Sequence, residues 1–178
     1  DGSTGLTTED FGYSGDGPDS DILDSLFDDL IGCNEVKNVM EELRATVEFS
    51  VAKGMPASNS VSFNYLFLGN PGTGKTTIAK RMGKMFHALG LLAGDDLREA
   101  KASDLVTGYT GQAGKQTREL LKQCRGGVLF IDEAYQLDPS RGGPFMTEAV
   151  DELVGALTED EFKGKLLVIL AGYDADME

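Results

Sequence analysis

The chain has 178 residues, of which 40% are hydrophobic and 26% are charged, which is ordinary for a soluble globular protein and favours a single domain. Its 30 Asp and Glu residues outnumber its 16 Lys and Arg residues, so the formal net charge is −14. This balance disfavours free binding to nucleic acid, because contacts with phosphates need clustered Lys and Arg. No apolar run approaches the roughly 20 residues that a membrane span requires.

The first part of the chain has the composition of an acidic tail. Residues 1–20 are rich in Gly, Ser, Thr and Asp, and no Lys or Arg precedes Lys37. We therefore predict a disordered acidic tail at 1–20 and one folded domain at 21–178. An acidic docking segment is the alternative interpretation of the tail. The chain begins with Asp1, so we expect it to be a piece of a longer protein.

The two cysteines, Cys33 and Cys124, stand far apart in the sequence. Two isolated cysteines make neither a disulfide framework nor a zinc site. They fit a reducing compartment, where they act as small buried hydrophobic residues. We therefore expect an intracellular, cytoplasmic protein, with the nucleus as an alternative.

Apolar periodicity predicts one long helix, followed by alternating strands and helices. The first helix ends before Gly54 and Pro56, because these residues terminate helices. Its predicted apolar stripe comprises Val36, Val39, Met40, Leu43, Val47 and Val51. Downstream, we expect strands at 63–68, 97–102, 128–131 and 166–170, and helices at 74–89, 113–124 and 145–157. Such alternation predicts an α/β fold, with a parallel sheet between two helical layers in a three-layer α-β-α core.

Residues 69–77 read Gly-Asn-Pro-Gly-Thr-Gly-Lys-Thr-Thr, which is the phosphate-binding pattern called Walker A. Glycines let the backbone close around phosphates, and the N–H groups at the start of the following helix face the anion. Lys75 supplies a charge for the β- and γ-phosphates, and the hydroxyl of Thr76 is a candidate ligand of Mg²⁺. The candidate nucleotide-binding residues of this loop are Gly69, Asn70, Pro71, Gly72, Thr73, Gly74, Lys75, Thr76 and Thr77.

Residues 128–133 read Val-Leu-Phe-Ile-Asp-Glu, the Walker B form of four apolar residues followed by two acids. In a parallel sheet this strand carries the acids to the carboxyl edge, beside the phosphate loop. Asp132 is the candidate to hold Mg²⁺, mostly through water. Glu133 is placed to orient and deprotonate an attacking water, so Glu133 and Lys75 are the candidate catalytic residues. Together the motifs predict binding and hydrolysis of a magnesium-bound nucleotide. No Asn-Lys-x-Asp pattern occurs, so the sequence shows no basis for the selection of guanine.

A longer set of segments resembles the AAA+ ATPases of the CbbX/CfxQ (SpoVK-like) type. The resemblance is carried by the phosphate loop, by Gly-Gly-Val-Leu-Phe-Ile-Asp-Glu-Ala-Tyr at 126–135, and by Val-Ile-Leu-Ala-Gly-Tyr at 168–173. It includes Ile-Gly-Cys-Asn-Glu-Val-Lys at 31–37 and Asp-Leu-Val-Thr-Gly-Tyr-Thr-Gly at 104–111. The similarity runs from about Leu23 to the last residue, in the family's order.

This resemblance implies a ring-forming, usually hexameric ATPase that remodels a protein or polypeptide client. It implies that Ile31 and Gly32 border the adenine, and that Tyr109 lies in the central pore and grips a threaded chain. An aromatic ring suits that role because it offers a large apolar area with little side-chain entropy to lose. An ordinary loop tyrosine is the alternative for Tyr109, since the next position of the family's aromatic–hydrophobic–Gly pattern is Thr110 here.

The sequence departs from the family pattern near its C-terminus. Many AAA+ ATPases place a polar sensor, often Asn, at the end of the strand expected at 166–170. The matching place here is Tyr173 or Asp174, so the sensor role does not carry over directly. The chain stops at Glu178, and the arginine finger, the last sheet strand and the C-terminal helical lid are expected beyond it. We therefore expect an incomplete AAA+ large subdomain that binds ATP weakly and turns over little in isolation.

Three other functions are consistent with part of the pattern. The main alternative is a nucleotide-responsive protein-interaction module in a larger protein, with little or no turnover. A small-molecule P-loop kinase would transfer phosphate to an acceptor, but the sequence shows no acceptor pocket or arginine-bearing lid. A DNA motor of the same superfamily is disfavoured by the acidic charge balance. Some members of the family activate rubisco, but nothing in this sequence identifies that client.

Overall fold

The protein is described by a computed structural model that covers residues 25–27, 33–106 and 112–173. The predicted tail at 1–20 lies outside these ranges, as do Ile31, Gly32, Tyr109 and Asp174. In chain order the described elements are α2 (Asn34–Ala52), η2 (Ala57–Asn59), β1 (Asn64–Leu68), α3 (Lys75–Ala88), β2 (Leu97–Lys101), α4 (Ala102–Leu105), α5 (Ala113–Cys124), β3 (Val128–Asp132), η3 (Ala134–Leu137), α6 (Pro139–Thr158) and β4 (Leu167–Gly172).

The four described strands form one parallel sheet in the order β1-β4-β3-β2. The central strands, β3 and β4, are buried along almost their whole length. This agrees with their continuous apolar sequences, because a parallel strand covered on both faces has no solvent-facing side. Since all the strands point the same way, their carboxyl ends meet at a single edge of the sheet.

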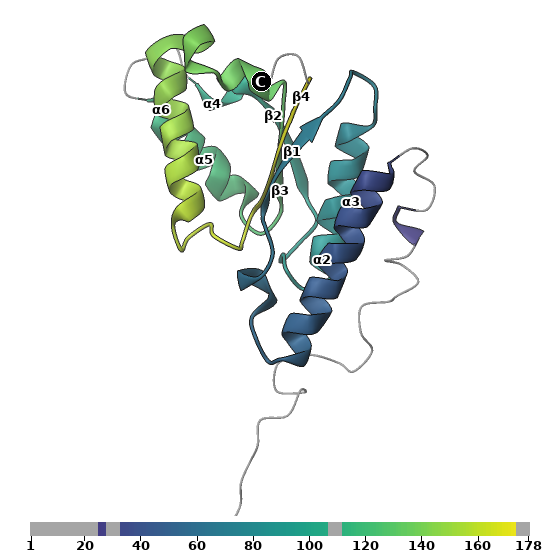
Figure 1. The fold of residues 1–178 in the computed structure, drawn as a ribbon. Coiled ribbons are helices and arrows are strands. Elements are labelled where there is room, and N and C mark those ends of the chain that lie inside the picture. The colour runs from purple at the N-terminus through teal and green to yellow at the C-terminus, as the bar shows by residue number, and fades with distance from the viewer. Residues whose placement is uncertain (1–24, 28–32, 107–111, 174–178) are drawn as a thin grey trace, which may run out of the picture.

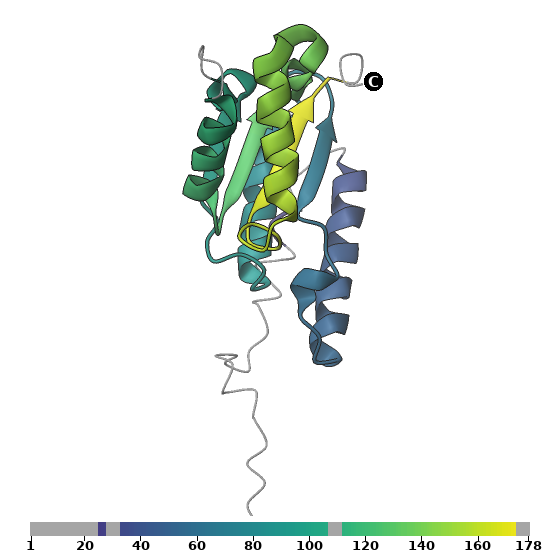
Figure 2. The ribbon, with the colours of Figure 1, turned by 90° about the vertical axis from the view of Figure 1, so that its left-hand side faces the viewer.

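Helices cover both faces of the sheet, which confirms the predicted three-layer core (Figures 1 and 2). Val128 and Phe130 of β3 point into the cluster that contains α2 and α3. Leu129 and Ile131 point into the opposite cluster, which contains α5 and α6. The alternation follows from the two-residue period of a strand. Helix α3, which follows β1, packs in the first cluster, and α6, which follows β3, packs in the second. The connections after β1 and β3 thus leave the carboxyl edge toward opposite faces of the sheet, an arrangement that opens a crevice between them.

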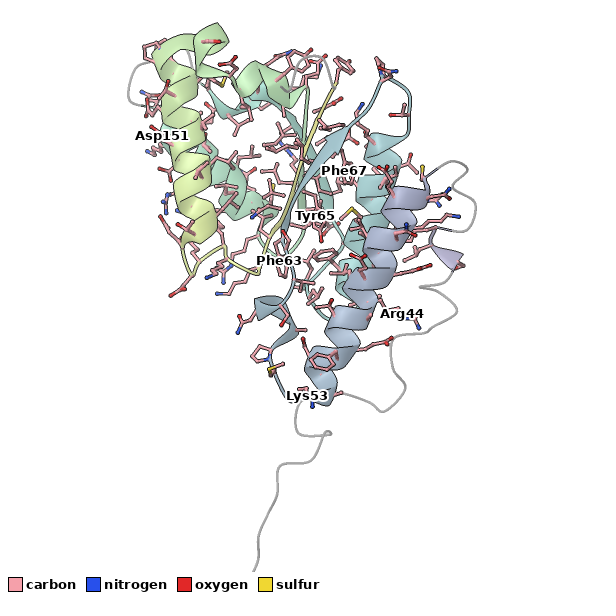
Figure 3. All side chains as sticks on the ribbon, in the orientation of Figure 1. Arg44, Lys53, Phe63, Tyr65, Phe67 and Asp151 are labelled. Atoms are coloured by element: carbon pink, nitrogen blue, oxygen red, sulfur yellow. The ribbon has the colours of Figure 1, made fainter. Side chains whose placement is uncertain are left out.

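Aromatic residues fix α3 against the sheet. Phe63, Tyr65 and Phe67 lie between the first strand and helices α2 and α3 (Figure 3). Phe86, near the end of α3, is fully buried and meets the ring of Phe63 at 5.5 Å and that of Tyr65 at 6.2 Å, both edge-on. Such edge-to-face pairs add to the stabilisation by burial. They hold the far end of α3, and with it the direction in which its N-terminus points.

On the other face, one arginine ties α5 to α6. The guanidinium of Arg118 donates to Glu152 and, through both of its terminal nitrogens, to the two carboxylate oxygens of Glu159, at 2.9 and 2.7 Å. A bidentate pair of this kind fixes orientation as well as charge. Hydrogen bonds from Arg118 lower the pKa of the Glu159 carboxyl below its ordinary value.

Several predicted boundaries and faces are corrected by the structure. In α2, Met40, Leu43 and Val47 are buried as predicted, but Val39 and Val51 are 41% and 47% exposed. Ser50 is buried in their place. The buried residues are spaced by three, four and three, which follows the helical period of 3.6 residues. The two exposed valines lie one position off that line.

The helix predicted at 145–157 begins earlier in the structure. Helix α6 begins at Pro139, and its backbone is broken only at Gly143, where φ is 65° and ψ is −157°. The side chain of Asp138 caps the first turn, because its Oδ1 accepts a hydrogen bond of 2.8 Å from the backbone N–H of Ser140. Pro139 suits the first helical position, where no N–H is needed. The short elements η2, α4 and η3 were not predicted, and β4 extends two residues beyond its predicted end. No helix in the described part of the chain is both long and apolar enough to cross a membrane.

Candidate nucleotide-binding site

The predicted phosphate loop, residues 69–77, joins β1 to α3 at the carboxyl edge of the sheet. The backbone N–H of Gly69 donates to the carbonyl of Gly172 at 3.1 Å, so the loop starts tied to the end of β4. Gly72 and Gly74 have φ values of 77° and 84°, in the left-handed region that favours glycine. No atom lies within 4 Å of the Cβ that either would gain. Glycine is therefore required here for backbone conformation, and the space above it stays open.

The N-terminus of α3 faces this open space. The helix begins at Lys75, its N-cap Gly74 has no side chain to accept a hydrogen bond, and no acid lies in the first turn. The first N–H groups of the helix therefore have no side-chain partner from the cap, and they carry the positive end of the helix dipole. Residues 70–74 are exposed, while Lys75 and Thr76 are half-buried. This arrangement is a ready binding site for an anion.

The ammonium of Lys75 lies over the loop. Its Nζ donates to the carbonyl oxygens of Gly69 and Asn70, at 2.6 and 3.1 Å. It also lies 5.3 Å from the centroid of the Tyr173 ring, within the range of a cation–π interaction. The charge predicted to meet phosphates is therefore held at the mouth of the loop.

The two predicted acids lie at the same edge of the sheet. A single strand, β4, separates β1 from β3, and with strands about 4.8 Å apart the ends of β1 and β3 are about 10 Å apart. Side chains from both ends can therefore share one ligand. Asp132 and Glu133 are half-buried. The backbone N–H of Glu133 donates to Oδ1 of Asp132 at 2.9 Å.

Glu133 has an unusual backbone conformation. Its φ of 53° and ψ of 40° are left-handed, and it is the one residue other than glycine with a positive φ in the part of the chain that is described. A side chain pays a steric cost in this region, and such residues cluster at functional sites. The backbone turns sharply here, directly after the strand, and η3 begins at the next residue.

A glutamine not predicted from the sequence holds the Glu133 carboxylate. Nε2 of Gln136 donates to Oε2 of Glu133 at 2.9 Å. The two residues are three apart, and one turn of 3-10 helix brings such residues into line. The Ala-Tyr-Gln-Leu sequence of η3 is too short to show a periodic pattern of apolar residues that would predict this turn. The one sequence feature that points to the contact is a polar residue at the third position after Glu133.

Two tyrosines connect the halves of the site. The rings of Tyr135 and Tyr173 lie 5.7 Å apart with 32° between their planes. Tyr135 follows the acids by two residues, and Tyr173 is the first residue after β4. Contacts therefore run from Lys75 through Tyr173 to Tyr135, beside Glu133. Of the two positions considered for a sensor, the structure brings Tyr173 into the site.

A cavity of about 740 Å³ extends from the phosphate loop between β1, α2 and α3. Gly69, Thr73 and Lys75 line its polar end. The rest of its wall includes apolar side chains, namely Val36, Val39, Met40, Phe67, Ile78 and Met82. Tyr65 also lines it, and burial raises the pKa of this phenol, so its hydroxyl stays neutral. Pockets of this size and mixed character bind small molecules.

The donor set of the site fits a magnesium-bound phosphate. The Thr76 hydroxyl and the Asp132 carboxylate are oxygen ligands of the hard type that Mg²⁺ takes, usually one or two at a time with waters and substrate phosphates completing the shell. Within residues 25–27, 33–106 and 112–173, no three His, Cys, Asp or Glu side chains gather into a metal cage. A magnesium ion bound mainly through phosphates needs no such cage.

Comparison with known proteins agrees with the fold and with these motifs. The model of the ATPase family associated with various cellular activities (AAA) matches residues 65–177. The chain belongs to this family, and its α/β P-loop architecture is confirmed. The AAA domain of FIGL-1, solved in complex with ADP, superposes with a TM-score of 0.54 at 23% identity, over 90% of this chain and 57% of that one. At that identity the likeness concerns the fold alone.

Several curated proteins are similar over most of the chain. Stage V sporulation protein K of Bacillus subtilis is 38% identical over 154 residues, which are 84% of this chain and 46% of that protein. The ESX-1 secretion system protein EccA1 of Mycobacterium tuberculosis is 41% identical over 157 residues, 85% of this chain and 27% of that protein. Protein CbbX of Cereibacter sphaeroides is 38% identical over 169 residues, 93% of this chain and 54% of that protein. The predicted CbbX-like character is confirmed, and the chain spans about half or less of these relatives' lengths.

Proposed function

We propose that this domain binds ATP with Mg²⁺ and hydrolyses it, and that the whole protein uses the reaction to remodel other proteins. The observation that carries the proposal is the cavity in which a phosphate loop and an apolar wall meet. The carboxylate expected to act on water is fixed at the same sheet edge by Gln136. The first feature suits a nucleotide, and the second suits hydrolysis.

Each residue then has a defined role. The loop N–H groups and Lys75 bind the phosphates, and the apolar wall takes the base. Thr76 and Asp132 would hold magnesium, and the ion would supply positive charge against the negative charge that develops on the phosphates. Glu133 accepts the proton of the attacking water, and Gln136 keeps one of its oxygens engaged so that the other can face the substrate.

The test compares Glu133→Gln with Lys75→Ala in the full-length protein. Glu133→Gln should keep ATP bound and lower turnover by at least about a hundredfold, which is the scale of a lost general base. Lys75→Ala should weaken binding itself. Glu161→Gln is a matched control, because this carboxylate lies at 3.9 Å from Arg118 on the α5–α6 side. Unchanged turnover in Glu133→Gln would instead support the nucleotide-responsive interaction module.

The proposal also concerns the assembly of the protein and its client. We infer a ring, commonly a hexamer, in which Tyr109 grips a polypeptide and a neighbouring subunit supplies an arginine. The isolated domain should therefore turn over slowly. The names of the relatives point to different processes, sporulation and secretion, so they select no client. Measuring the mass of the full-length protein with and without ATP tests the ring, and Tyr109→Ala should remove client stimulation while leaving basal turnover.

A further inference from the structure

We propose that Tyr173 is a positioning residue that holds Lys75 through the face of its aromatic ring, not through its hydroxyl. This inference rests on the proposed function, since it concerns how the lysine is prepared for phosphates. The motif comparison left position 173 without an assigned role, because tyrosine is not the polar side chain expected there. The geometry supplies a different role.

The backbone around Tyr173 is fixed relative to the phosphate loop. The preceding residue, Gly172, ends β4 and accepts the hydrogen bond of 3.1 Å from the backbone N–H of Gly69. Strand β1 pairs along its full length with β4, and Leu68 lies opposite Gly172. The tyrosine is therefore attached to the strand next to the loop that it faces. Tyr173 is half-buried, and the centroid of its ring lies 5.3 Å from Nζ of Lys75.

The contacts of Nζ explain why a ring is useful there. An ammonium has three N–H donors, and two carbonyl oxygens of the loop accept from Lys75. Those bonds are directional and must be exchanged when phosphate oxygens arrive. Attraction to the face of a ring depends weakly on direction, so it can persist while Nζ changes partners. The flexible lysine is thus restrained before the ligand arrives, which reduces the entropy lost on binding.

The ring of Tyr135 packs against the ring of Tyr173. Its centroid lies 5.7 Å from that of Tyr173, with the planes tilted by 32°. Tyr135 belongs to η3, the turn that starts directly after Glu133. The restraint on Lys75 is therefore built from the acidic side of the site, and the two motifs are mechanically connected through a pair of rings.

The experiment measures the affinity of this chain for ADP, ATP and adenosine in three variants. Tyr173→Leu should weaken the binding of ADP and ATP by about threefold to tenfold, which is the scale of a partly exposed cation–π contact. The affinity for adenosine should not change. Tyr173→Phe keeps the ring and should bind within about twofold of the unaltered chain. Phe49→Leu is the matched control, because Lys53 lies 5.7 Å from that ring. Phe49 stands about 14 Å along α2 from Met40, the last residue of this helix that lines the cavity.

Thermal unfolding of each variant identifies any loss of folding. If the Tyr173→Leu protein unfolds, a variant with pentafluorophenylalanine at position 173 is used instead. Pentafluorophenylalanine keeps the shape of the ring but reverses the charge of its face. This variant should lose as much affinity for ADP as predicted for Tyr173→Leu. The proposal is wrong if Tyr173→Phe weakens ADP as much as leucine does, since the hydroxyl would then be responsible. It is also wrong if removing the ring changes nothing. If the unaltered chain binds no ADP, the proposed function itself fails, and this inference with it.

Discussion

Gly127, the residue before β3, allows β2 and β3 to meet, and Gly127→Ala should destabilise the protein by a calculable amount. A Cβ at this position would lie 2.5 Å from the backbone oxygen of Asp96, whereas real Cβ contacts essentially never fall below 3.0 Å. The obstacle is backbone, so it cannot rotate away. Gly127 is not among the residues with positive φ, so the predicted effect is steric.

The magnitude follows from two losses. Overpacking of this kind costs about 1–3 kcal/mol. The same Asp96 oxygen accepts the 2.9 Å hydrogen bond from the backbone N–H of Val128 that opens the β2–β3 ladder, and weakening it adds about 0.5–1.5 kcal/mol. We therefore expect a loss of about 2–4 kcal/mol, or roughly 5–15 °C in melting temperature for a domain of this size.

Urea unfolding followed by circular dichroism measures this loss directly. Gly94→Ala is the matched control in the neighbouring loop, because no atom lies within 4 Å of its added Cβ. It should change the free energy of unfolding by less than about 1 kcal/mol, with a stabilising sign, since alanine restricts the unfolded chain. A Gly127→Ala protein that unfolds at the same urea concentration as the unaltered chain would refute the close approach of the two segments.

Three further outcomes are expected. Gln136→Ala should lower ATP turnover on the order of tenfold, because the Glu133 carboxylate loses the hydrogen bond that holds it. The affinity for ADP should not change, and an equal loss of turnover and of ADP affinity would contradict this prediction. Cys33 lines the cavity, so ADP should slow its labelling by a maleimide several-fold, while the second cysteine, whose thiol pKa is raised by burial, stays slow throughout. The folded pKa of Glu159 is lowered by Arg118, so this pair stabilises above the ordinary glutamate pKa of about 4.3 and loses its contribution as the pH falls below it. Glu159→Gln should therefore flatten the acid limb of the stability profile, and identical limbs would exclude the effect.

The parts of the fold that the sequence predicts well are those controlled by local pattern. The apolar run at 128–131 can only be a strand buried on both faces, and the glycines of the phosphate loop require a special backbone. The face of α2 was less certain, because Val39 is apolar yet lines a cavity, and Ser50 is polar yet buried. Periodicity alone does not distinguish an apolar residue in a core from one in a binding pocket.

The contacts that complete the site depend on tertiary structure. The hydrogen bond from Gln136 requires the left-handed conformation of Glu133 and one turn of 3-10 helix after it, and neither has a clear sequence signal. The contact between Lys75 and Tyr173 joins residues that are far apart in the sequence. It exists because β4 is inserted beside β1, an order that the linear pattern of strands does not specify.

Under the proposed function, the backbone strain of Glu133 opposes stability to catalysis at one position. A left-handed conformation costs a residue with a Cβ roughly 1–2 kcal/mol, and glycine or asparagine would relieve much of this strain. Random mutagenesis selected only for heat resistance should therefore enrich Gly or Asn at position 133, and each enriched clone would have lost the carboxylate. Under the proposed function, the protein keeps a strained residue at the position where an acid would act on water.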